Sequence, residues 1–111
     1  MFIRLFIRTT LHNKASEIVK HVVSNIPNEF IIGMNYKIEP YWKFDDTMVA
    51  EINLEISKGF DDKAKNDFLN SISDNWIFFH HDKSEALSSI TMEGGCTMHY
   101  DLEMINVQFR D

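Results

Sequence analysis

Histidines and carboxylates are the residue types here that could perform chemistry, and they gather in the second half of the chain. His80, His81 and Asp82 are consecutive, and His99 and Asp101 follow further on. Such groups could bind a metal or act as an acid–base pair. Successive side chains of a strand point to opposite faces, so at most one of His80 and His81 can join a site with His99. No spacing typical of zinc ligands is present, and one packed histidine beside one solvated histidine is the favoured interpretation.

Cys96 is the only cysteine, and it follows Gly94-Gly95. A cysteine nucleophile needs a base, such as His99, and a third supporting group, and no such group can be identified. A free thiol in a loop is therefore favoured. The chain also lacks the glycine-rich phosphate and dinucleotide motifs, the G-x-S-x-G elbow and H-E-x-x-H. We expect no enzymatic activity, no cofactor and no metal.

A mixed aromatic and acidic segment, residues 39–46, indicates a different kind of site. Its side chains are three large aromatics and three carboxylates: Tyr41, Trp42, Phe44, Glu39, Asp45 and Asp46. Tyrosine and tryptophan dominate the energetics of protein interfaces, so an exposed aromatic segment ringed by acids suits a basic partner. The alternative is that Trp42 or Tyr41 folds back to cap the edge of the core. Both interpretations stay open, and Asp82, Asp101 and Glu103 are further candidate contact residues.

The charge is unevenly distributed. Residues 1–43 carry six basic and three acidic residues, whereas residues 44–111 carry five basic and fourteen acidic ones, giving a net charge of −6. An acidic surface repels nucleic acid and attracts basic proteins. The lone cysteine argues against a secreted, disulfide-stabilised domain, and no apolar run is long enough for a signal peptide or a membrane span. We expect a cytoplasmic protein without direct nucleic-acid or membrane binding.

Strict alternation in Thr47–Ser57 predicts the strand that organises the chain. Ala50, Ile52, Leu54 and Ile56 share one face, and Glu51 and Glu55 lie on the other. This pattern is typical of an antiparallel sheet with helices on one face only. Phe2–Thr9 repeats it, with Arg4 and Arg8 on the open face near Glu51 and Glu55. RNA binding to that face is disfavoured by the carboxylates. Coverage by the final strand or by a second copy is favoured instead.

The other elements follow from periodicity and turn residues. Residues 14–26 form a helix that Asn13 can cap, Met34–Phe44 pairs with the organising strand in a hairpin, and a second helix follows its cap at Asp61. Trp76–His81 is predicted as an interior strand, Ser84–Met92 as a short helix or a strand, and Thr97–Phe109 as a final strand with a bulge near Met104-Ile105. The chain is thus predicted to be one α+β domain, residues 1–111. It has a mostly antiparallel sheet, two main helices on one face, and a ferredoxin-like β-α-β-β-α-β order plus an extra C-terminal strand.

In size and character the chain resembles the immunity proteins of bacterial toxin–immunity pairs, such as those of contact-dependent growth inhibition. The segments that carry the resemblance are Glu39–Asp46 and Trp76–Asp82, with Asp101 and Glu103. It implies a protein that neutralises a cognate toxin, often a basic nuclease domain, by blocking its active site or substrate cleft. One rival is a small ferredoxin-like dimeric enzyme or ligand-binding subunit using His80, His81 or His99. Another is an accessory subunit of a larger complex, and a homodimer remains open in each case.

Overall fold

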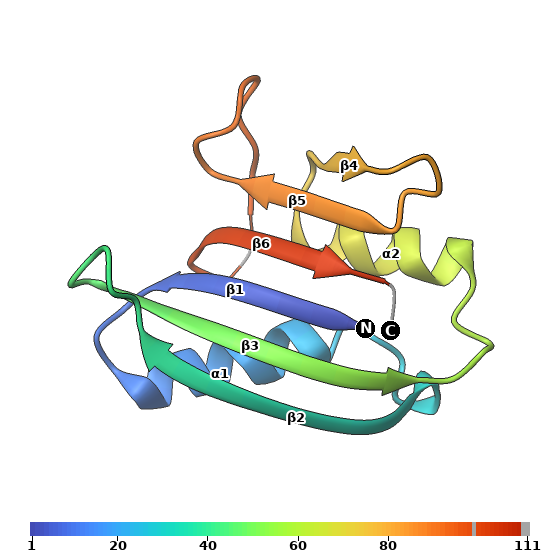
Figure 1. Cartoon of the computed structure of the whole chain (residues 1–111), viewed down its shortest axis with the longest axis horizontal. Coiled ribbons are helices and arrows are strands. Elements are labelled where there is room, and N and C mark those ends of the chain that lie inside the picture. The colour runs from blue at the N-terminus through green and yellow to red at the C-terminus, as the bar shows by residue number, and fades with distance from the viewer. Residues whose placement is uncertain (99, 110–111) are drawn as a thin grey trace.

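A six-stranded sheet with helices on one face forms the protein (Figure 1). The computed structural model describes residues 1–98 and 100–109. In chain order the elements are β1 (Phe2–Arg8), α1 (His12–Val23), a 3-10 turn (Asn28–Phe30), β2 (Ile31–Pro40), β3 (Thr47–Ile56), α2 (Asp62–Ile72), β4 (Ile77–Phe79), β5 (Glu85–Ser89) and β6 (Leu102–Gln108). The sheet order is β2-β3-β1-β6-β5-β4, and all neighbouring strands are antiparallel. The α+β class and the open antiparallel sheet are confirmed.

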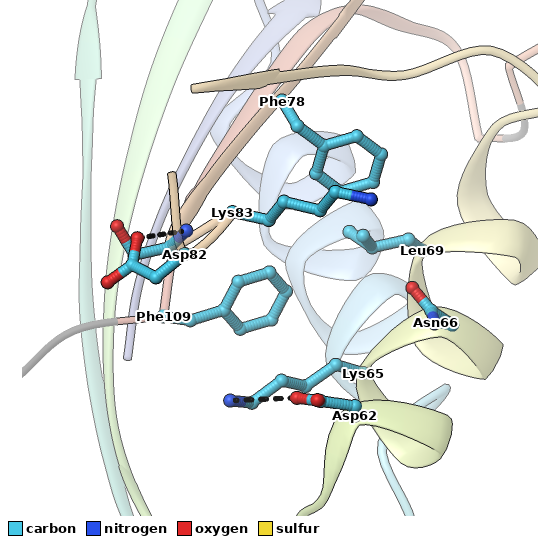
Figure 2. A pocket seen from close by; sticks show the side chains of 9 residues that line it. Asp62, Lys65, Asn66, Leu69, Phe78, Asp82, Lys83 and Phe109 are labelled. Carbon is cyan, nitrogen blue, oxygen red and sulfur yellow. Dashed lines mark hydrogen bonds and ion pairs between the residues drawn. The ribbon is translucent and has the colours of Figure 1, made fainter. Parts of the chain in front are cut away.

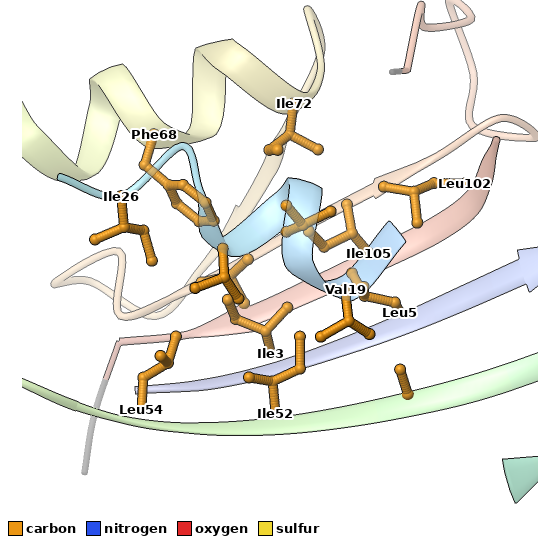
Figure 3. Packing of buried hydrophobic residues seen from close by; sticks show 14 of the residues in the cluster. Ile3, Leu5, Val19, Ile26, Ile52, Leu54, Phe68, Ile72, Leu102 and Ile105 are labelled. Atoms are coloured by element: carbon orange, nitrogen blue, oxygen red, sulfur yellow. The ribbon is translucent and has the colours of Figure 1, made fainter. Parts of the chain in front are cut away.

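The aliphatic rows of β1 and β3 meet as the alternation predicts. Ile3 lies opposite Ile52, and Leu5 lies opposite Ala50. All four are fully buried, and Figure 3 shows Ile3, Leu5 and Ile52 packed with side chains from both helices. Burial of these rows removes the apolar face of the sheet from water and is the main favourable contribution to folding. Within the described residues, no helix covers the other face of the sheet.

The two helices begin differently. Asp61 caps α2 as predicted, because its carboxylate accepts a hydrogen bond of 2.9 Å from the Ala64 amide. In α1 the predicted cap at Asn13 is wrong, since the helix already starts at His12 with Leu11 as its N-cap. Thr9 Oγ1 instead accepts a 3.1 Å hydrogen bond from the Leu11 amide and holds the chain where it enters α1.

The last third of the chain departs most from the expected order. The segment predicted as an interior strand is the edge strand β4, and Ile77, Phe78 and Phe79 are all exposed. Ser84–Met92 contains the strand β5 and no helix. Three strands therefore follow α2, and the final strand β6 is internal, between β1 and β5. The predicted interior position failed because a short aromatic run has the same composition on an edge as in the middle of a sheet.

A bulge interrupts β6 close to where the sequence predicts it. Phe6 pairs with Met104, but the next residue of β1, Ile7, pairs with Leu102. Glu103 is therefore an extra residue of β6, and the bulge lies one position before the predicted Met104-Ile105 step. Leu102 and Ile105 are both buried, which is possible because the extra residue resets the alternation.

Candidate protein-binding site

The connection between β2 and β3, residues 41–46, is called the tip here. It extends from the end of the sheet at which β1 finishes (Figure 1). The backbone closes it tightly: the Tyr41 amide donates to the Thr47 carbonyl at 2.8 Å, and the Thr47 amide donates to the Phe44 carbonyl at 3.3 Å. The Thr47 hydroxyl also donates to Asp46 Oδ1 at 3.1 Å. These bonds fix the loop conformation without using the aromatic side chains.

The three aromatic side chains of the tip have separate positions. The Tyr41 ring packs edge-on against Phe6 of β1, with ring centroids 5.2 Å apart. Trp42 and Phe44 contact the Tyr41 ring at 5.7 and 5.9 Å, but Trp42 is 86% exposed and Phe44 is 53% exposed. Tyr41 therefore folds back onto the sheet, while Trp42 faces solvent. Tyr41 covers the open face of the sheet, however, and not the edge of the core.

A cavity of about 250 Å³ lies between the tip and the strands beside it. Its apolar walls come from Phe6, Tyr41, Phe44 and Met104, and Lys43 and Glu103 also line it. Phe6 and Met104 are directly paired across β1 and β6, so they form a continuous surface at the base of the tip. The alternation in Phe2–Thr9 puts Phe6 on the same face as Arg4 and Arg8, but it does not indicate that Phe6 lies next to the tip. Only the register of β1 against its neighbours brings these residues together.

Two carboxylates near the tip, those of Asp46 and Glu103, lie beside Arg8. Arg8 Nε lies 2.5 Å from Glu103 Oε1 and 3.9 Å from Asp46 Oδ2. Glu39 forms a loose ion pair of 3.9 Å with Lys37, and Asp45 is exposed. The predicted residues of segment 39–46 and Glu103 thus form one surface. Arg8 was not predicted as part of it.

The structure does not bring Asp101 and Asp82 to this surface. Asp101 forms a 3.2 Å ion pair with Lys14 of α1, so it belongs to the helix side of the molecule. Asp82 lies in the turn between β4 and β5, at the opposite end of the sheet from the tip (Figure 1). A single partner surface centred on the tip would exclude Asp82.

His80, His81 and Cys96 have ordinary surroundings. His80 Nε2 lies 3.3 Å from Glu85 Oε1 on the surface, His81 is exposed, and His99 falls outside the described residues. Cys96 is half-buried, and its thiol donates to the Ser89 carbonyl at 3.0 Å. Among residues 1–98 and 100–109, no three His, Cys, Asp or Glu side chains are placed to hold a metal ion together.

The centre of the open face is occupied by an ion-pair network. Arg4 donates to Glu51 Oε2 through Nη2 at 2.7 Å and through Nε at 3.1 Å, and Lys37 Nζ is 3.3 Å from Glu51 Oε1. The Arg4 hydrogen bond is the main reason that the pKa of Glu51 is lowered below its ordinary value. The predicted Arg4–Glu51 pair is confirmed, whereas Arg8 pairs with Asp46 and Glu103 and not with Glu55. Glu51 therefore stabilises the sheet.

Comparisons of the chain with protein-family models, with curated proteins and with solved structures gave no match. In the described part of the chain, neither helix has the length and apolar composition needed to cross a membrane. The tip and its surroundings are therefore the features from which a function is inferred.

Proposed function

We propose that this chain is a bacterial immunity protein that acts in the cytoplasm. It binds a cognate toxin, a basic nuclease domain, through the tip and blocks its active site or substrate cleft. The observation that carries the proposal is Trp42, a large aromatic side chain that is 86% exposed on a tip with three neighbouring carboxylates. We further propose that β1-α1-β2-β3-α2-β6 is a ferredoxin-like unit into which the hairpin β4-β5 is inserted.

The proposed mechanism assigns different tasks to the two residue types. The net charge of −6 and the carboxylates Glu39, Asp45 and Asp46 attract a basic cleft over long distances and raise the association rate. Trp42 then enters the cleft and loses its contact with water, which slows dissociation. A nuclease whose substrate cleft contains an aromatic side chain and carboxylates cannot hold a phosphate backbone there.

The rigid base of the tip favours binding. Tyr41 is held by Phe6 and by the backbone, so the exposed aromatics are presented without ordering a loop at the moment of binding. Pre-organisation of this kind lowers the entropic cost of association. The cavity of about 250 Å³ behind Phe44 can accept one apolar side chain of the partner.

The test is binding to the protein encoded next to this chain, measured by titration calorimetry, and inhibition of any nuclease activity which that protein has. Trp42→Ala should weaken binding at least about 30-fold, since truncation of an interface anchor costs about 2 kcal/mol or more. Asp45→Asn should mainly slow association and reduce its salt dependence. The matched controls are Ile32→Ala, an exposed apolar residue on β2, and Glu29→Gln, an exposed acid away from the tip.

Two results would overturn the proposal. One is the absence of binding or inhibition for the wild-type pair. The other is a Trp42→Ala variant that inhibits as strongly as the Ile32→Ala control. Loss of a catalytic activity in the same variant, with no effect on protein binding, would favour the enzyme alternative.

A further inference from the structure

A second cavity, of about 500 Å³, lies at the other end of the molecule, between α2 and the turn that joins β4 to β5. Figure 2 shows its apolar walls, formed by Leu69, Phe78 and Phe109, and the lysines Lys65 and Lys83 beside them. The volume lies in the range of small-molecule sites. The other lining residues are polar: Asp62, Asn66, Asp82 and Ser84. The tip is not part of this cavity, and the proposed toxin contact does not use it.

Each lysine of the cavity lies against an aromatic ring. Lys83 Nζ is 5.5 Å from the centre of the Phe78 ring, and Lys65 Nζ is 5.4 Å from the centre of the Phe109 ring. Stacking on a ring holds an ammonium group close to the apolar wall. The cavity therefore offers flat apolar surface and positive charge side by side.

The nearby carboxylates leave Lys83 available. Asp82 Oδ1 accepts a hydrogen bond of 3.1 Å from the Ser84 amide, and in Figure 2 its carboxylate points away from the Lys83 ammonium. Asp62 reaches Lys65 only at 4.0 Å. Among the described residues, no carboxylate forms an ion pair with Lys83. An ammonium group on an apolar wall without a counter-ion is a suitable partner for a ligand anion.

The backbone around Lys83 is held in an unfavourable conformation. His80 and Lys83 have φ angles of 71° and 53°, in the left-handed region that non-glycine residues rarely adopt. The turn is closed by hydrogen bonds from the Lys83 amide to the His80 carbonyl at 3.2 Å and from the Phe109 amide to the Ser84 carbonyl at 2.7 Å. The fold thus maintains a strained turn that directs Lys83 over Phe78, as strained residues at binding sites often do.

We propose that this cavity binds a small planar molecule that carries a carboxylate, sulfonate or phosphate group. The flat part of the ligand lies between Phe78, Leu69 and Phe109, and the anionic group contacts Lys83. Lys65 gives a second, weaker attraction, because Asp62 partly neutralises it. The chain as a whole carries a net negative charge, so most of its surface repels anions. Lys65 and Lys83 therefore determine where an anionic ligand binds.

The experiment uses the whole protein with two probes of matched size, anionic 1-naphthoate and neutral 1-naphthamide. Amide chemical shifts are followed by two-dimensional NMR during each titration. Naphthoate should shift amides of α2, the turn 80–84 and Phe109, and it should bind about tenfold more tightly than naphthamide. Lys83→Met, which keeps the apolar stem, should weaken naphthoate about tenfold and leave naphthamide unchanged.

Lys63→Met is the matched control, because Lys63 also lies on α2 but pairs with Asp67 away from the cavity. It should change naphthoate binding less than twofold. Three results would each overturn the proposal: no naphthoate binding at millimolar concentration, shifts confined to the tip, or equal effects of the Lys83 and Lys63 variants.

Discussion

Replacement of Trp42 and of Tyr41 by alanine should affect folding stability very differently, although the residues are adjacent. Trp42 is 86% exposed, so only about one seventh of its side chain is removed from water on folding. With about 250 Å² for a tryptophan and about 25 cal/mol per Å², that burial is worth at most about 1 kcal/mol. Trp42→Ala should therefore lower the free energy of unfolding by less than about 1 kcal/mol, close to the usual range for surface substitutions.

Tyr41→Ala should cost considerably more. The Tyr41 ring is half-buried and packs against Phe6, Trp42 and Phe44. About 100 Å² of lost burial and the lost aromatic pair with Phe6 together predict a loss of about 3–4 kcal/mol. The backbone bonds of the tip do not depend on the side chain, so the sheet should still form.

Urea denaturation followed by far-ultraviolet circular dichroism measures both values without relying on the fluorophore that one variant removes. The reasoning is refuted if Trp42→Ala loses 2 kcal/mol or more, since Trp42 would then be a packing residue and not a free contact residue. It is equally refuted if Tyr41→Ala loses less than about 0.5 kcal/mol, within the ordinary range of surface substitutions. Tyr41→Phe is the control, and it should keep nearly all of the stability because the ring contacts remain.

Three further variants test the scaffold. Asp61→Ala removes the α2 cap and should lower the free energy of unfolding by about 1 kcal/mol in urea denaturation. If the loss were no larger than that of Asp62→Ala, the Asp61 side chain would not stabilise α2 as a cap. Glu51→Gln should lower the free energy of unfolding near neutral pH, and the difference in this free energy between variant and wild type should shrink as the pH falls. Folding lowers the pKa of the Glu51 carboxyl below its ordinary value of 4.5. The ionised carboxylate therefore stabilises the folded protein above pH 4.5, and this contribution is lost as the pH falls through the folded pKa. A stability difference that does not change with pH would show that the ion pairs of Glu51 are not its cause. Phe68→Ala, at a residue only 1% exposed, should cost about 3–5 kcal/mol in calorimetry, and a loss below about 1 kcal/mol would show that Phe68 is not a core residue.

The first two thirds of the fold follow directly from the sequence because their inward residues are large and aliphatic. Alternation in β1 and β3 predicts both the buried rows and the side on which the helices pack. The Arg4–Glu51 pair then follows from the neighbouring position of the two strands. Such predictions depend only on the two-residue period and on the chemistry of each face.

The strand β5 escaped a definite prediction because its inward residues are small or polar. Ala86 and Ser88 face the helices and are fully buried, while Leu87 lies toward the open face. Ser88 is tolerated in the core because its hydroxyl bonds to Ser73 Oγ at 2.6 Å and to the Asn75 carbonyl at 2.7 Å. Because Leu87 is the large apolar residue of β5, an assignment based on large apolar residues would bury the face of β5 that carries Leu87, which is the wrong face. Only the partners of Ser88, distant in sequence, make the strand recognisable.

The candidate site depends on the same kind of long-range information. A single extra residue in β6 places both Glu103 and Met104 on the open face, where an uninterrupted strand would place only one of them. Met104 then extends the surface on which Tyr41 rests, and Glu103 holds Arg8 from the side opposite Asp46. These ion pairs contribute little to stability, at most about 1 kcal/mol each, but they place Arg8 between β6 and the tip. The bulge in β6 thereby supplies two side chains of the surface beside the tip, from which Trp42 faces solvent as the proposed toxin contact requires.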